Sequence, residues 1–449
     1  MFIRKLTLGA ALMAALATTQ AAPSRAGEFT ALEPNQRIAD FVVEAIYENE
    51  SGKEMGARFR HEPSGFALDV LRIQSIPQAF TWVNSPPPSS QGEPHTLEHL
   101  LLGKGTKGQY VASLEDMSLG RSSAYTEQRR TCYHFHTEAG KDVFFKLFAE
   151  KLDAMLNPTF TDEEIRREVC NMGLVDDKES GKLWLEEKGT VYNEMVSTYE
   201  RPWGQLYQVL LQSVYGPGHP LAQSAGGEPS AIRQMQPEDI RKFHGGTHHL
   251  NNMGSVVSIG DEISLGECLT SFSAILSRVE PNAERGEDPA DLYHRLPPAN
   301  PAPAGEITLT HFPHQNENEP GVIAFAWPAT RMDMSAYDLY MMELFLDLLA
   351  SGQTSNLYKK FIDSQTRIKD LGANSVGYWM WDQPGQPFFM YLSNVDADKC
   401  TKEEVADVRR IISEEIKSIA NWAPGSEELK EFNERAMNQV ISDRRATRK

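Results

Sequence analysis

The sequence is short of cysteine, with four residues in 449 and no C-x-x-C pair. The wide spacing of these cysteines excludes a cysteine-based metal cluster, and it leaves room for one or two disulfides in an oxidising compartment. The spacing gives no connectivity for such disulfides. The four positions are Cys132, Cys170, Cys268 and Cys400.

Positive charge is also scarce, because 44 lysines and arginines face 62 acidic residues and the formal net charge is −18. Binding to nucleic acid phosphates needs a basic face, so a nucleic acid partner is excluded. An acidic surface suits cationic peptide substrates, although solubility alone also explains it.

Long apolar runs are missing beyond the first residues, and a membrane helix needs about 20 apolar residues. Arg4 and Lys5 precede a short apolar run, Leu6 to Ala17, and small residues follow. This pattern predicts a signal peptide over residues 1–22, with Ala17, Ala21, Ala22 and Ala26 as candidate cleavage points. The mature protein is then expected to be exported and soluble, in a bacterial periplasm or secreted elsewhere. An uncleaved membrane anchor is the alternative.

The chain is long enough for two or three domains. Residues 280–305 are rich in proline and acid and predict an extended linker. Strand-like and helical stretches alternate before it, over 27–279, and the same order returns after it, over 306–449. The sequence therefore predicts an α+β fold with two α+β units in series.

A candidate metal-binding and catalytic motif lies in the stretch "EPHTLEHLLLGKGTKG", residues 93–108. On a helix, His95 and His99 lie on one face, one turn apart, and both can offer a nitrogen to one Zn²⁺. Glu98, on the adjoining flank, can act as general base towards a water that the metal activates. The order H-x-x-E-H is the inverted zinc-peptidase motif, but a five-residue pattern also arises by chance.

A catalytic zinc needs a third protein ligand, and Glu194 in "GTVYNEMVSTY" is the best candidate. Residues 182–200 read as one helix, so Glu187, two turns earlier on the same face, would support the site. Solvent exposure is the alternative for either glutamate. A rival cluster, His244, His248 and His249, has adjacent histidines that point in different directions, which disfavours it as a catalytic centre.

Several motifs together resemble the pitrilysin/insulinase family of zinc metallopeptidases, and within it the presequence-protease branch. They are "PHTLEHLLLGKGTKG", "SSAYTEQRRTCYHF", "GTVYNEMVSTY", "YGPGHPLAQSAGGEPSAI" and "LLASGQTSNLYKKFI", in this order. The long gap between HxxEH and "NEM", and "AGGEP", are typical of that branch. The resemblance runs from about Arg37 to the end and implies the family's α+β unit twice, the second without an HxxEH.

The resemblance implies one Zn²⁺ held by His95, His99 and Glu194, with Glu98 as general base and Glu187 as a supporting acid. It also implies an edge strand on which substrate peptides add as a further strand. The residues of that strand are Ser123, Ala124, Tyr125 and Thr126. The implied function is an exported zinc metalloendopeptidase that hydrolyses short unstructured peptides.

Two departures from the family matter. Ser123 stands where the family usually has asparagine. Family members of this branch are also longer, and their second half closes a chamber and supplies an arginine and a tyrosine for the oxyanion. Two alternatives follow: a half-enzyme or non-catalytic subunit that needs a partner chain, or a peptide-binding protein that does not cut.

Overall fold

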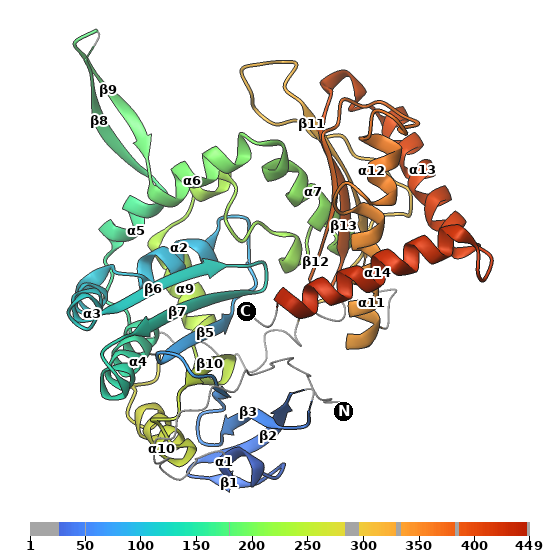
Figure 1. Cartoon of the computed structure of the whole chain (residues 1–449). Helices are drawn as coiled ribbons and strands as arrows, with labels where there is room; N and C mark the ends of the chain where they lie inside the picture. The colour runs from blue at the N-terminus through green and yellow to red at the C-terminus, as the bar shows by residue number, and fades with distance from the viewer. Residues whose placement is uncertain are drawn as a thin grey trace. The chain divides into compact units, whose positions relative to one another are not determined.

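The computed structural model describes residues 27–49, 51–178, 180–282, 296–328, 334–381 and 386–446 (Figure 1). The signal peptide predicted for residues 1–22 lies outside these ranges, as do residues 283–295 of the predicted linker. Within them, no helix has the length and apolar character that a membrane crossing requires. Cys132, Cys170, Cys268 and Cys400 all carry free thiols.

The chain forms two compact units, and the described residues of each combine helices and strands, as the predicted α+β class requires. Unit 1 comprises residues 1–195 and 224–296, and unit 2 comprises residues 196–223 and 297–449. The predicted domain of residues 27–279 differs, because residues 196–223 join the C-terminal unit. The reason lies in one helix of that segment, described below.

Unit 1 is built on a sheet that has eight strands in the described residues, and only the pairing of β10 with β4 is parallel. In sheet order the strands are β1 (Arg37–Ile38), β2 (Phe41–Glu48), β3 (Glu54–His61), β4 (Ala67–Arg72), β10 (Met253–Ile259), β5 (Gln78–Asn84), β7 (Arg130–Thr137) and β6 (Gly120–Thr126). β6 is therefore an edge strand, and among the described residues no strand pairs with its outer side.

The core of unit 1 lies between this sheet and two helices, α4 (Lys141–Leu156) and α10 (Leu265–Leu276). Phe148 and Phe272 from these helices meet edge to face, with ring centroids 4.8 Å apart, and Phe41 and Phe59 enter from the strands. Residues 141–156 carry apolar side chains at helical spacing, and α4 buries that face. Unit 1 also contains α1 (Gly27–Thr30), α2 (Glu93–Leu101), α3 (Gly105–Met117), α5 (Asp162–Val169), α8 (Pro229–Ile232) and α9 (Pro237–Thr247). The helix α6 (Thr190–Tyr199) begins in unit 1, and its last residues, 196–199, are assigned to unit 2.

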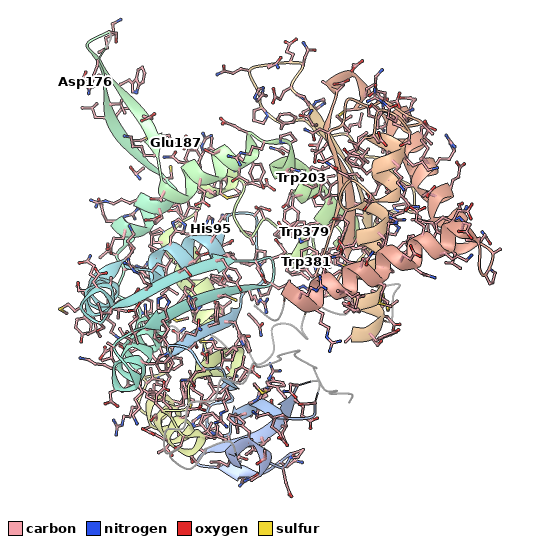
Figure 2. The ribbon with its side chains drawn as sticks, in the orientation of Figure 1. His95, Asp176, Glu187, Trp203, Trp379 and Trp381 are labelled. Carbon is pink, nitrogen blue, oxygen red and sulfur yellow. The ribbon has the colours of Figure 1, made fainter. Side chains whose placement is uncertain are left out.

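A two-stranded hairpin, β8 (Asn171–Asp177) and β9 (Lys182–Lys188), separates α5 from α6. Figure 1 shows it projecting from unit 1, and in Figure 2 Asp176 lies far out along it and Glu187 near its base. The prediction of one helix over residues 182–200 is therefore wrong in its first part. The helix α6 begins only at Thr190, after Gly189.

Unit 2 contains a three-stranded antiparallel sheet in its described part, in the order β11 (Gly321–Trp327), β13 (Phe388–Val395) and β12 (Ser375–Met380). Alternate residues of β13 serve its two faces. Met390 and Leu392 enter a core shared with helices of the C-terminal segment. Those helices are α11 (Ala336–Ala350), α12 (Asn356–Phe361), α13 (Lys402–Ala420) and α14 (Glu427–Ala446).

The other face of this sheet is covered by α7 (Pro202–Tyr215), which comes from the segment that joins unit 2. Trp203 meets Tyr391 of β13 edge to face at 4.7 Å, and Tyr207 stacks on Trp379 of β12 at 5.1 Å. Figure 2 labels Trp203 on α7 and Trp379 on the sheet. This aromatic contact explains why residues 196–223 fold with the C-terminal unit.

Candidate metal centre

The helix α2 carries the HxxEH motif and begins at Glu93. Gly92 precedes it with φ of 81°, a conformation that favours glycine, and Pro94 occupies its first turn. His95 and His99 lie one turn apart on one face, and their ring centroids are 4.7 Å apart. Both rings are largely covered, because only 12% and 22% of these side chains is exposed.

The glycines of "AGGEP" bring a loop against the start of α2. A Cβ on Gly226 would lie 2.7 Å from the Met195 side chain and 3.9 Å from His95 Nδ1. A Cβ on Gly92 would lie 2.6 Å from the Gly226 carbonyl oxygen. A larger residue at Gly92 would collide with the loop. The close packing of this loop on the start of α2 places the Gly226 carbonyl oxygen 3.4 Å from His95 Nδ1.

The helix α6 brings Glu194 to the two histidines across 95 residues of sequence. Its Oε2 lies 3.6 Å from His95 Nε2 and 3.7 Å from His99 Nε2. These distances exceed a hydrogen bond. They are close to the ~3.4 Å that separates two ligand atoms of a tetrahedral zinc at ~2.1 Å each. Elsewhere in the described residues, no other group of three His, Cys, Asp or Glu side chains lies close enough to hold an ion.

Both histidines are oriented so that Nε2 points to Glu194. His99 Nδ1 lies 3.2 Å from Glu168 Oε2, and His95 Nδ1 faces the Gly226 carbonyl. A carboxylate and a carbonyl can only accept, so each bond needs the proton on Nδ1 and leaves the lone pair on Nε2. Two imidazole nitrogens and a carboxylate, with acceptors behind the rings, fit the usual set of three protein ligands of a catalytic zinc.

Glu168 is a residue that the sequence analysis missed. It sits on α5, is 1% exposed, and also pairs with Lys104, whose Nζ lies 2.9 Å from Oε1. Burial alone would raise its pKa, but the hydrogen bonds from His99 and Lys104 prevail and lower the pKa to about 2. The same bond to Glu168 raises the pKa of His99. Glu168 is therefore an ionised carboxylate that holds the His99 ring.

Glu98 is buried beside the histidines, at 6% exposure, and accepts a hydrogen bond of 2.6 Å from the Thr126 hydroxyl. Thr126 is the last residue of the edge strand β6. Ser123, Ala124 and Tyr125 precede it on that strand, and Ser123 and Tyr125 are exposed. The predicted substrate strand thus ends at the predicted general base.

Glu187 does not lie where the sequence analysis placed it. It belongs to β9, so its spacing of seven residues from Glu194 is not two helical turns. Its carboxylate pairs with Arg233 at 2.7 Å and accepts from the Tyr192 hydroxyl at 3.0 Å. The acidic residue that contacts a histidine of the site is Glu168.

The rival cluster is buried and engaged with the chain itself. His244 and His249 face the carbonyls of Met155 and Gly245, at 2.8 and 2.7 Å. Burial holds the pKa of His248 well below its usual range, which keeps this side chain neutral. These three histidines are structural.

No family model matches the chain. Among curated proteins, it is 32% identical over 204 residues to protein HypA of Clostridium perfringens, covering 44% of this chain and 20% of that protein. It is 24% identical over 387 residues to presequence protease 1 of Arabidopsis thaliana, covering 82% of this chain and 33% of the relative. The chain thus spans about a third or less of the length of these relatives.

Solved structures share the fold. An M16-like peptidase from Alicyclobacillus acidocaldarius has a TM-score of 0.57 at 18% identity, over 86% of this chain and 83% of that one. An inactive M16 peptidase domain from Pseudomonas fluorescens has a TM-score of 0.53 at 14% identity, over 85% and 84%. The fold is therefore found both in a protein named as an M16-like peptidase and in a domain named inactive.

Proposed function

We propose that this chain, a member of the pitrilysin/insulinase family related to its presequence-protease branch, is the metal-binding part of a zinc metalloendopeptidase. Short unstructured peptides are the proposed substrates. The observation that carries the proposal is the convergence of His95, His99 and Glu194, with Glu98 alongside. The presequence-protease relatives support the peptidase class.

His95, His99 and Glu194 are the proposed ligands of one Zn²⁺. Zinc bound there would supply a Lewis acid that polarises a peptide carbonyl and makes water more acidic. Glu98 then takes the proton of the attacking water and passes it to the leaving amine. The Thr126 hydroxyl, 2.6 Å from Glu98 Oε2, fixes the carboxylate in place.

The edge strand β6 is the proposed seat of the substrate. A peptide that pairs with its outer side uses main-chain hydrogen bonds, which accept many sequences but require an extended, unfolded segment. Since Thr126 both ends this strand and contacts Glu98, a bound peptide would run towards the general base. Ser123, Ala124 and Tyr125 are the proposed contacts along the strand.

The Glu98→Gln variant tests this proposal. It keeps the shape of the side chain but cannot take a proton, so peptide cleavage should fall by about 10²–10⁴-fold while the zinc content stays at the wild-type level. Cleavage is followed by mass spectrometry of an unstructured peptide, with Glu163→Gln on the exposed side of α5 as the matched control. Undiminished cleavage in a zinc-loaded Glu98→Gln protein would rule out Glu98 as the base.

A second candidate is a half-enzyme or assembly subunit that works only with a partner chain. The presence of a domain named inactive among the proteins of similar fold favours this candidate. A chain that binds zinc but cuts only after a partner is added would support it. A third candidate, peptide capture without cutting, predicts that an incubated peptide keeps its mass.

Export is a further part of the proposal, supported by the signal-like pattern of residues 1–22. A bacterial periplasm is the proposed compartment. The curated presequence proteases are named for mitochondria and chloroplasts, so the proposal of a periplasm rests on the pattern of residues 1–22 and not on these relatives. N-terminal sequencing of the mature protein tests it, and a mature chain that keeps Met1 contradicts it.

A further inference from the structure

The β8–β9 hairpin projects from unit 1 and leaves large apolar side chains in solvent (Figure 1). Five of them are 52–68% exposed, namely Met172, Leu174, Leu183, Trp184 and Leu185. A group of exposed apolar side chains on one small element commonly marks an interaction site. A two-stranded hairpin is also only marginally stable alone in water, so a partner that adds strands to it would stabilise it.

The strand β9 offers an open edge for such a partner. Among the described residues it pairs only with β8, so the backbone groups on its outer side have no strand to bond. Neither proline nor glycine interrupts its seven residues. The strand β8 is a poorer template, because Gly173 weakens its middle and Asp176 stands opposite Leu183 on the apolar face. An open, apolar and regular edge such as that of β9 favours pairing with another strand.

The sequence of β9 is complementary to itself when two copies run antiparallel about a two-fold axis at Trp184. Residues equally far from the axis then face each other. Lys182 of one copy opposes Glu186 of the other, and Leu183 opposes Leu185. Because the axis repeats every contact, each dimer gains two opposite-charge pairs, two leucine pairs and a tryptophan pair at its centre.

The neighbouring registers fit less well. An axis at Leu185 sets Lys182 opposite Lys188 of the other copy, and like charges directly opposite each other are destabilising. An axis at Leu183 sets Lys182 opposite Trp184, so both opposite-charge pairs are lost. Glu186 already lies 3.6 Å from Lys188 of its own strand, but both side chains are exposed, which leaves Glu186 accessible to a second lysine. The charges therefore select the axis at Trp184.

We propose that the outer edge of β9 is an interface for a second copy of this chain. The two hairpins form one four-stranded antiparallel sheet in the order β8-β9-β9-β8, with the two-fold axis at Trp184. The contact is small compared with that of permanent dimers, so the chain is in equilibrium between monomer and dimer, and the dimer grows with concentration. The inference does not depend on the proposed protease activity.

Sedimentation velocity of the full chain over a wide concentration range tests the interface. Lys182→Glu and Glu186→Lys should each weaken dimerisation about tenfold, because each sets like charges opposite each other twice. The double variant Lys182→Glu/Glu186→Lys restores the opposite-charge pairs and should restore dimerisation. Lys146→Glu, the same charge change at an exposed position of α4, should leave dimerisation unchanged. A chain that is monomeric at every concentration would leave the hairpin to another partner and overturn the proposal, as would a double variant no better than the single ones.

Disulfide trapping tests the position of the axis without relying on charge. In Trp184→Cys the two introduced thiols lie opposite each other across the axis, within the Cα separation that a disulfide spans. Mild oxidation should therefore link two chains, as non-reducing electrophoresis would show. Met172→Cys is the matched control, since this residue is as exposed but lies on β8, away from the axis. Cross-linking of Trp184→Cys that is no faster than that of Met172→Cys would contradict the proposed pairing.

Discussion

At the scale of single residues, the metal centre depends on the side chains that hydrogen-bond to the proposed ligands and fix their orientation. His99 offers Nε2 because Glu168 holds its Nδ1, and Glu168 in turn is held by Lys104. Partners of this kind typically contribute 10–100-fold to metal affinity by fixing the ring and its proton.

We therefore expect Glu168→Gln to weaken zinc binding by about 10–100-fold, because the amide accepts less strongly and does not carry the charge that favours Nδ1–H. Competition with a fluorescent chelator measures the affinity. Glu187→Gln is the matched control, since Glu187 contacts Arg233 and Tyr192 rather than a histidine. Equal losses in the two variants would contradict these roles.

The contrast between these two glutamates shows how far sequence reasoning reaches at the residue scale. His95, Glu98 and His99 could be found because one helix turn sets their spacing. Glu168 carried a weaker signal: it lies three residues after Ile165 and directly before Val169, so an acid falls in the buried stripe of α5. A buried acid of this kind indicates a fixed partner, but only the fold identifies His99.

At the scale of elements, the β8–β9 hairpin is an insertion between two helices that form the site. Asn171 and Lys188 face each other at its base, and its large apolar side chains are exposed. Sequence periodicity predicted a helix here and was wrong, because a projecting hairpin has no buried face that would require alternating apolar residues. Gly181 and Gly189, which bracket β9, were the signal that residues 182–188 are separate from the helix.

Removing this hairpin should leave the metal centre intact. Replacing residues 172–187 by a two-residue Asn-Gly turn joins positions that already face each other. The change deletes the Glu187–Arg233 ion pair, which is solvent-screened and therefore contributes little to stability. We expect an unchanged zinc affinity by chelator competition, and a lost site would mean that the hairpin positions α6.

At the scale of the whole molecule, each unit is built from two separate segments of the chain. Residues 196–223 belong to unit 2, although residues of unit 1 precede and follow them. The α+β class and the recurrence of strands and helices after residue 305 could be predicted from pattern alone. The assignment of residues 196–223 to unit 2 could not be predicted in this way. The helix α7 is amphipathic, and its sequence does not indicate which sheet it covers. The contacts of Trp203 with β13 and of Tyr207 with β12 show that α7 covers the sheet of unit 2.

A fragment of residues 27–279 should therefore be less stable than one that follows the observed units. It carries α7 without its sheet, so Trp203 and Tyr207 lose their aromatic contacts with Tyr391 and Trp379. The matched fragment joins residues 27–195 to 224–296 through a short flexible linker. Thermal melting and limited proteolysis should favour the matched fragment, and a higher Tm for residues 27–279 would contradict the assignment of α7.

The zinc content of the purified chain tests the central claim most directly, by elemental analysis after dialysis and X-ray absorption at the zinc edge. We predict about one zinc per chain with nitrogen and oxygen ligands, and loss of that zinc in His95→Gln, His99→Gln and Glu194→Gln but not in His134→Gln. A wild-type chain without zinc, or zinc retained in the Glu194→Gln and His95→Gln proteins, would contradict the account.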